Sequence, residues 1–375
     1  MEKPISLSIC ADHAYIEAIQ TAVRSLNRFQ TLLVFGTGGS ALGARVCLDY
    51  ASYVGTPAPR AKVIESVDVA CLDALRPEIE ASDTALFFVS KSGETLETLF
   101  QFLWVRSLLA GGGGDSGYAA RCFVLTENKP SSLRALAVAN GMTVLDHHLE
   151  IGGRYSVFSN VGMIPAGFVG LDVSEVMAGG AETLMQSDTL FPTIARALTG
   201  KTHLAILTYC EGLTPLLHWF AQLWAESLGK NGKGCSVSAW TGPVFQHSQL
   251  QRWMDGPNDT VFLVVRTQAA PSDSWRAPVQ SAQATPTQQL LSGVSSHELL
   301  HVLENSTIES LRAAGRDVID YDFGDLRARN LGRSFAEFMV LVMRIAEHLQ
   351  VNPFDQPGVE DGKLRAKQKL RDRSK

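Results

Sequence analysis

Short apolar segments alternate with helix-like segments along most of this chain. One set consists of Thr31–Phe35, Lys62–Ile64, Ala85–Val89, Arg121–Leu125 and Met142–Leu145. A second set consists of His203–Tyr209, Cys235–Trp240, Thr260–Arg266 and Val318–Tyr321. Strands that are apolar on both faces and separated by helices are typical of parallel sheets covered on both sides. The pattern therefore predicts an α/β protein with two doubly wound, flavodoxin-like parallel-sheet domains.

Helical periodicity frames these two sets. It predicts a helix at about Asp12–Asn27 and a long amphipathic helix at about Ser334–Gln350, which ends the second set. We expect a first domain at residues 1–165, a second at 166–362 and a basic C-terminal tail at 363–375.

Two segments break the periodicity. Gly111–Gly114 is a run of glycines, and Thr267–Ser296 is rich in Ala, Pro, Ser, Gln and Thr. Both are interpreted as exposed loops, and the second has the length of a lid over a binding site.

The composition narrows the class of protein. Of the 375 residues, 45% are hydrophobic and 19% are charged, as in folded globular proteins. The net charge of −5 argues against nucleic acid or an anionic membrane as the main partner. The sequence contains no 18-residue apolar run and no signal-like start, and its six cysteines lack metal-site spacing. These features predict a cytoplasmic protein.

Two polar, glycine-rich turns follow neighbouring strands of the first set. Gly36–Gly43 (GTGGSALG) follows the first strand and opens a helix, and Ser90–Thr95 (SKSGET) follows the third. Glycine lets the backbone approach an anion, and amides at a helix N-terminus attract it. Both turns lie at carboxyl ends of strands, so they predict one shared phosphate site. Its candidate ligands are Gly39, Ser40, Ser90, Lys91, Ser92 and Thr95.

Each turn also has an alternative interpretation. The first fits the dinucleotide pattern G-x-G-x-x-A, with Glu65 where an acid could bind a ribose, or it is a purely structural turn. The second also fits a capping box before a helix. A dinucleotide does not need the second turn, whereas a sugar monophosphate would use both.

Glu226 and Arg154 are the candidates for proton transfer and charge stabilisation. Glu226 lies on the last turn of an amphipathic helix that Gly229 ends, beside a loop with two lysines that could hold an anionic substrate. Arg154, in GGRYS, could stabilise an oxyanion. The alternatives are a solvated carboxylate at a helix end and a structural ion pair.

His247 and the segment Asn352–Lys363 complete the candidate chemistry. His247 lies between Gln246 and Ser248 and could donate and accept protons near neutral pH, or it is a structural histidine. The segment contains two prolines and two glycines and could deliver Gln356 and Lys363 to a shared cleft.

Six motifs resemble those of the glucose-6-phosphate isomerase (phosphoglucose isomerase) family. In chain order they are GTGGSALG, SKSGETLET, GGRYSVFSNVG, AESLGKNGKG, QHSQLQRWMDGP and NPFDQPGVEDGK. The resemblance covers about Leu32 to Lys363 and is to the compact form of the family, which has two domains of the sugar-isomerase (SIS) type. It implies reversible isomerisation of glucose 6-phosphate and fructose 6-phosphate through an enediolate, as in glycolysis and gluconeogenesis, without a metal or cofactor.

The resemblance also implies roles for individual residues. Glu226 would move a proton between C2 and C1, Arg154 would stabilise the enediolate, and His247 with Lys363 would open the cyclic sugar. Gln356 would lie near the substrate, and the phosphate would be held by Ser40, Ser90, Ser92 and Thr95 with Lys91 beside them. In the family this histidine comes from the partner subunit, which implies a homodimer. Phe245 stands where we expect a small or polar residue, which leaves the orientation of His247 open.

Three other functions would use some of these residues. A dual-specificity phosphoglucose/phosphomannose isomerase would share most of them. A non-catalytic sugar-phosphate-binding regulator would need the phosphate turns, but not Glu226, Arg154 and His247 together. A nicotinamide dehydrogenase would rest on the first turn and Glu65 alone.

Overall fold

Two parallel sheets organise the molecule. The computed structural model describes residues 4–56, 59–111, 117–183, 190–267, 275–279, 281 and 283–373. The first sheet contains β1 (Thr31–Phe35), β2 (Arg60–Ile64), β3 (Thr84–Val89), β4 (Cys122–Glu127) and β5 (Thr143–His147). The second contains β6 (His203–Thr208), β7 (Ser236–Thr241), β8 (Thr260–Arg266) and β9 (Asp317–Asp322). Every predicted strand overlaps one of these.

The four strands of the second sheet repeat the order of the first four strands of the first sheet. The order is β2-β1-β3-β4-β5 in the first and β7-β6-β8-β9 in the second, and all pairings are parallel. This is the flavodoxin-like order, whose switch point lies between the first and third strands of each unit. The predicted fold class is therefore confirmed. The switch point of the first sheet, between β1 and β3, places the two glycine-rich turns side by side.

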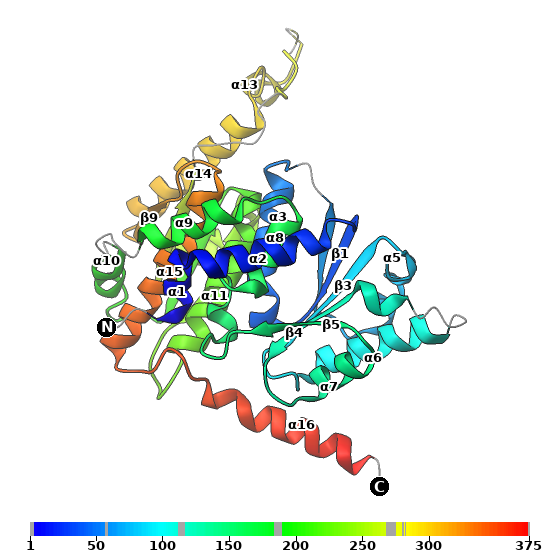
Figure 1. The fold of residues 1–375 in the computed structure, drawn as a ribbon. Coiled ribbons are helices and arrows are strands. Elements are labelled where there is room, and N and C mark those ends of the chain that lie inside the picture. The colour runs from blue at the N-terminus through cyan, green and yellow to red at the C-terminus, as the bar shows by residue number, and fades with distance from the viewer. Residues whose placement is uncertain are drawn as a thin grey trace.

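Helices cover both sheets (Figure 1). They are α1 (Ile5–Ser8), α2 (His13–Leu26), α3 (Leu42–Tyr53), α4 (Val69–Asp73), α5 (Arg76–Glu80), α6 (Leu96–Gly111), α7 (Ser132–Ala139), α8 (Asn160–Phe168), α9 (Val173–Thr183), α10 (Leu190–Ala197), α11 (Thr214–Leu228), α12 (Leu250–Asp255), α13 (Pro286–Leu290), α14 (Ser296–Ala313), α15 (Ala328–Leu349) and α16 (Glu360–Asp372). Four single 3-10 turns shape the site region: η2 (Gly38–Ser40), η4 (Gly153–Tyr155), η6 (Val244–His247) and η7 (Pro357–Val359). Within the described residues, no helix has both the length and the apolar character needed to cross a membrane.

The long helix α15 begins six residues before the predicted start. Its first turns contain Gly332, where an added Cβ would lie 1.8 Å from the carbonyl oxygen of Val176 in α9. Glycine weakens the apolar periodicity of the sequence but lets the two helix backbones touch. The contact with α9, which a helical pattern cannot reveal, therefore extends the helix.

Helices lie within the predicted loops and at the predicted domain limits. Thr267–Ser296 includes the short helix α13, which a capping box between Thr285 and Gln288 begins, although residues 268–274, 280 and 282 lie outside the described part. Gly111 ends α6, and residues 112–114 lie outside the described part. The predicted limits at 165 and 362 fall inside α8 and α16.

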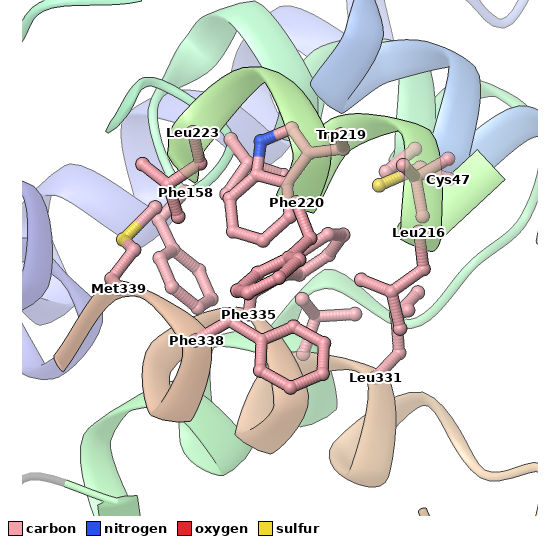
Figure 2. Packing of buried hydrophobic residues seen from close by; sticks show 14 of the residues in the cluster. Cys47, Phe158, Leu216, Trp219, Phe220, Leu223, Leu331, Phe335, Phe338 and Met339 are labelled. Carbon is pink, nitrogen blue, oxygen red and sulfur yellow. The ribbon is translucent and has the colours of Figure 1, made fainter. Parts of the chain in front are cut away.

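One hydrophobic cluster joins the two sheets. Leu32 and Val34 of β1 point into it together with Leu204 of β6, whereas alternate residues such as Leu33 face a separate cluster on the outer side. Helices α11 and α15 supply its centre, where the rings of Trp219 and Phe335 lie 4.9 Å apart (Figure 2). Because α11 is anchored in this core, the backbone that carries Glu226 is held rigidly.

Candidate active site

The first glycine-rich turn contacts the loop that carries Arg154. Gly38 has φ +56°, which favours glycine, and the chain forms η2 before α3 begins at Leu42. An added Cβ on Gly39 would lie 2.3 Å from the carbonyl carbon of Gly153. Ser156 Oγ also donates to the carbonyl of Gly39 at 3.1 Å. This turn and η4 are thus fixed against one another.

Glu65, the acid that favoured a dinucleotide-binding site, forms an ion pair with Arg45. Glu65 lies at the end of the second strand, and its Oε2 is 2.6 Å from Arg45 Nη2. A ribose hydroxyl would compete with this ion pair, so the alternative of a nicotinamide site loses its second feature.

The second turn is stabilised by its own hydroxyl groups. Ser90 is buried; its Oγ donates to Thr95 Oγ1 at 2.9 Å and accepts from the Gly93 amide at 3.2 Å. Ser92 is exposed and accepts from the Glu94 amide at 3.1 Å. These hydrogen bonds order the turn itself, at the carboxyl end of β3 and just before α6 begins at Leu96. The capping box and the phosphate site both stay predictions.

Lys91 forms an ion pair with the buried carboxylate of Glu127. Its ammonium lies 3.6 Å from Glu127 Oε1, and Glu127 also pairs with Lys129. Next to Glu127 in the sheet is His147, which is 2% exposed. Burial, with a smaller contribution from Lys91, lowers the pKa of His147 from 6.5 to about 4. His147 is therefore neutral at physiological pH.

Arg154 is the centre of the site. Its side chain is almost fully buried, on η4 directly after the strand β5 and the short loop that follows it. It donates five hydrogen bonds: to Ser227 Oγ (2.9 Å), Glu226 Oε2 (3.2 Å), Gln356 Oε1 (3.3 Å), the Pro353 carbonyl (2.5 Å) and the Asp355 carbonyl (2.8 Å). A buried guanidinium needs such partners to offset its desolvation. They fix its plane and its charge at one point.

Glu226 lies beside this guanidinium on the last turn of α11, and its side chain is 31% exposed. Its second oxygen, Oε1, accepts from Gln222 Nε2 at 2.8 Å, one helical turn earlier. The helix ends at Gly229, as its sequence predicts. The carboxylate is thus oriented from two sides while one part of it stays accessible to solvent.

The two lysines after α11 contact the chain segment that follows α15. Lys230 Nζ lies 2.8 Å from Asp355 Oδ1 and donates to the Asn352 carbonyl, and Lys233 Nζ donates to the Leu349 carbonyl at 2.8 Å. In this structure both cations bind the chain segment at the end of α15, and the expectation that they hold an anionic substrate stays a prediction.

His247 lies apart from the Arg154 cluster. It is exposed at the end of η6, and within the described residues its side chain makes no hydrogen bond or ion pair. Phe245 is buried between Tyr209 and Trp253, with ring centroids at 5.4 and 5.2 Å. The unexpected phenylalanine is therefore a core residue that anchors η6. Gln246 binds Tyr209 Oη at 2.6 Å, which leaves His247 facing outward.

Lys363 is also outside the cluster. It is exposed on α16 and pairs with Glu360 at 2.8 Å on the same helix. Gln356, by contrast, contacts Arg154, so the predicted delivery of both residues to one cleft holds for Gln356 alone within this chain.

Three residues that contribute to the cluster were not predicted from the sequence. Gln222 and Ser227 orient Glu226 and Arg154, and Tyr155 Oη lies 3.0 Å from Ser227 Oγ. Gln222 could have been found, because a residue four positions before Glu226 shares its helix face. The contact of Ser227 with Arg154 spans 73 positions, and no local pattern indicates it.

Comparison with known proteins decides the family. The family model described as phosphoglucose isomerase matches residues 14–375. The chain belongs to this family. The glucose-6-phosphate isomerase of Rubrobacter xylanophilus is 37% identical over 346 residues, which are 88% of this chain and 79% of that protein.

Solved structures share the fold of this chain. A hypothetical protein from Thermus thermophilus has a TM-score of 0.87 and 26% identity, covering 98% of this chain and 91% of that one. A glucose-6-phosphate isomerase from Chlamydia trachomatis has a TM-score of 0.76 at 22% identity, covering 98% of this chain and 75% of that one, and so shares the fold.

Proposed function

We propose that this phosphoglucose isomerase family member interconverts glucose 6-phosphate and fructose 6-phosphate at the Arg154–Glu226 cluster. Family membership and the names of its relatives support the aldose–ketose isomerisation. The observation that carries the assignment of the site is the pairing of Glu226 with a buried arginine at 3.2 Å, next to the two turns at the β1/β3 switch point.

Glu226 is the base in this proposal. It removes the proton from C2 of the open-chain sugar, the electron pair forms the C1–C2 double bond, and negative charge collects on O1. Return of the proton to C1, with transfer of the O2 hydroxyl proton to O1, gives the ketose. Hydrogen bonds from Gln222 and Arg154 hold the carboxylate in position for both transfers.

Arg154 stabilises the enediolate. A guanidinium stays charged at any working pH. The contacts with Ser227 and the two backbone carbonyls hold the guanidinium of Arg154 in one position during the reaction. A fixed positive charge of this kind lowers the energy of the charged intermediate more than that of the neutral sugar.

The phosphate is assigned to the two turns. Gly39 and Ser40 approach from the first, and Ser90, Ser92 and Thr95 from the second, with Lys91 adding positive charge. Because the first turn packs on η4, a bound phosphate fixes the distance from the sugar carbons to Arg154.

We further propose a homodimer in which His247 and Lys363 act on the sugar ring, His247 from the partner subunit. His247 is exposed and is not among the hydrogen-bond partners of Arg154 in its own chain. Apolar side chains are exposed near it and on the projecting α13–α14 segment (Figure 1): Val244, Leu290 and Val302. Exposed apolar groups of this kind are typical of subunit interfaces. All six cysteines are free thiols, which suits a cytoplasmic location.

The test is proton exchange at C2 of glucose 6-phosphate in deuterated water, followed by NMR. We expect the wild-type protein to exchange this proton and Glu226→Gln to lose exchange while still binding the sugar phosphate. Wild-type binding without exchange would refute isomerisation, and a variant that keeps a tenth of the rate would refute Glu226 as the base.

A further inference from the structure

Lys230 joins the end of the Glu226 helix to the segment that surrounds Arg154. Its side chain is 9% exposed, and its ammonium binds Asp355 Oδ1 at 2.8 Å and the Asn352 carbonyl. Asp355 Oδ2 in turn accepts from Asn352 Nδ2 at 3.2 Å, and Asn352 Oδ1 accepts from the Phe354 amide at 3.0 Å. We call Lys230, Asn352 and Asp355 the clasp.

The segment closed by the clasp supplies three of the five acceptors of Arg154. These are the carbonyls of Pro353 and Asp355, both on Nη2, and Oε1 of Gln356 on Nη1. The same Nη1 contacts Glu226. A shift of this segment therefore moves the guanidinium relative to the carboxylate that it orients.

We propose that Lys230 is a positioning residue for the isomerisation: by closing the clasp it fixes the 352–356 segment, and through it the guanidinium of Arg154. This inference rests on the proposed function of the Arg154–Glu226 cluster. Lys230 makes no hydrogen bond or ion pair with either side chain; it acts on them through the backbone carbonyls of Pro353 and Asp355.

The contacts of Lys230 argue against a direct role in substrate binding. Two of its three ammonium hydrogens are directed at Asp355 and Asn352, and little of the side chain is open to solvent. Lys230 is also the largest cause of the lowered pKa of Asp355, which keeps that carboxyl charged in the pair. An anion would have to break the ion pair to reach the ammonium.

The test compares steady-state kinetics of Lys230→Met and Asp355→Asn with the wild type. A displacement of the guanidinium by about 1 Å is expected to lower kcat by about 10- to 100-fold while KM stays within about twofold. Because both variants open the same clasp, the double variant should be no slower than the slower single variant. Lys230→Arg retains the ion pair and should recover most of the lost kcat.

Lys201→Met is the matched control. Lys201 has a similar environment at the opposite end of the second sheet: it is 13% exposed, pairs with Asp317 at 2.8 Å and donates to the Asn258 carbonyl at 3.0 Å. Lys201→Met should lower the thermal stability by about as much as Lys230→Met does, but leave kcat unchanged. The proposal is overturned if Lys230→Met keeps the wild-type kcat, if only KM rises, or if Lys201→Met loses as much kcat.

Hydrogen exchange separates this inference from the proposed function. Amides of residues 349–356 should exchange faster in Lys230→Met and Asp355→Asn than in the wild type or Lys201→Met, whatever the activity. Unchanged exchange would refute the clasp even if the enzyme is an isomerase. A wild-type protein without isomerase activity would refute the function, and the exchange data would still test the clasp.

Discussion

The contact between Gly39 and Gly153 makes Gly39→Ala a sharp test of the site geometry. The backbone of Gly39 lies outside the left-handed region, so alanine is tolerated by its dihedral angles, and the only obstacle is steric. Its new methyl group would lie 2.3 Å from the Gly153 carbonyl carbon and 2.6 Å from the Arg154 amide nitrogen. Both neighbours are backbone atoms and cannot rotate away.

The size of the effect follows from the missing space. Ordinary contacts begin near 3.4 Å, so the two turns have to separate by about 1 Å. Overpacking of this kind costs about 1 to 3 kcal/mol of stability, and a misplacement of about 1 Å between the phosphate turn and Arg154 is expected to lower kcat by about 100-fold. KM should change little, because the methyl group points at η4 and not at the ligand.

Rates in both directions of the isomerisation, measured with thermal unfolding, decide the outcome. Gly152→Ala is the control, because a Cβ there meets no atom within 4 Å. It should leave kcat within about twofold of the wild type. If Gly39→Ala retains the wild-type kcat, or if Gly152→Ala is equally impaired, the two turns do not set the position of Arg154.

Two further predictions concern His247 and His147. If His247 acts across a dimer interface, the inactive variants His247→Ala and Glu226→Gln should regain about a quarter of the wild-type activity when they are unfolded and refolded together. Half of the dimers are then mixed, and each mixed dimer has one intact site of two. No regain of activity would contradict a shared site. Burial lowers the pKa of His147 from 6.5 to about 4, so between these pH values the imidazole binds a proton in the unfolded chain but not in the folded one. The contribution of His147 to the free energy of unfolding is therefore fully present above pH 6.5, and the free energy of unfolding falls by about 3 kcal/mol as the pH is lowered to 4. Urea titrations should show this slope reduced in His147→Gln, and an unchanged slope would contradict the assignment.

The sequence predicted those features that local patterns encode. Strand positions follow from continuous apolar runs, and β1 and β8 match the predicted bounds, because buried parallel strands need apolar residues on both faces. The end of α11 at Gly229 was likewise predicted from one residue. The family motifs located Glu226, Arg154 and Gln356, which the structure brings together.

Features that depend on contacts far along the chain were missed. Lys230 and Lys233 were interpreted as cations for a substrate, since nothing in KNGKG shows that Asp355 and Leu349 lie opposite them. The early start of α15 depends on Gly332 meeting the backbone of α9, a contact across more than 150 positions. His247 and Lys363 were assigned to the site through the family, and the partner surface proposed to bring His247 there is not part of a single chain.

The hydrophobic cluster shared by the two sheets makes this molecule mechanically a single body. Domains joined by polar linkers rotate about a hinge, whereas a large apolar interface resists such rotation. Here Glu226 belongs to one sheet unit and Arg154 to the other, yet Tyr50 of the first unit and Phe323 of the second lie in a common interior, with ring centroids 6.1 Å apart. The spacing of the backbones that carry the base and the arginine is then inherited from the core and needs no domain closure in each turnover.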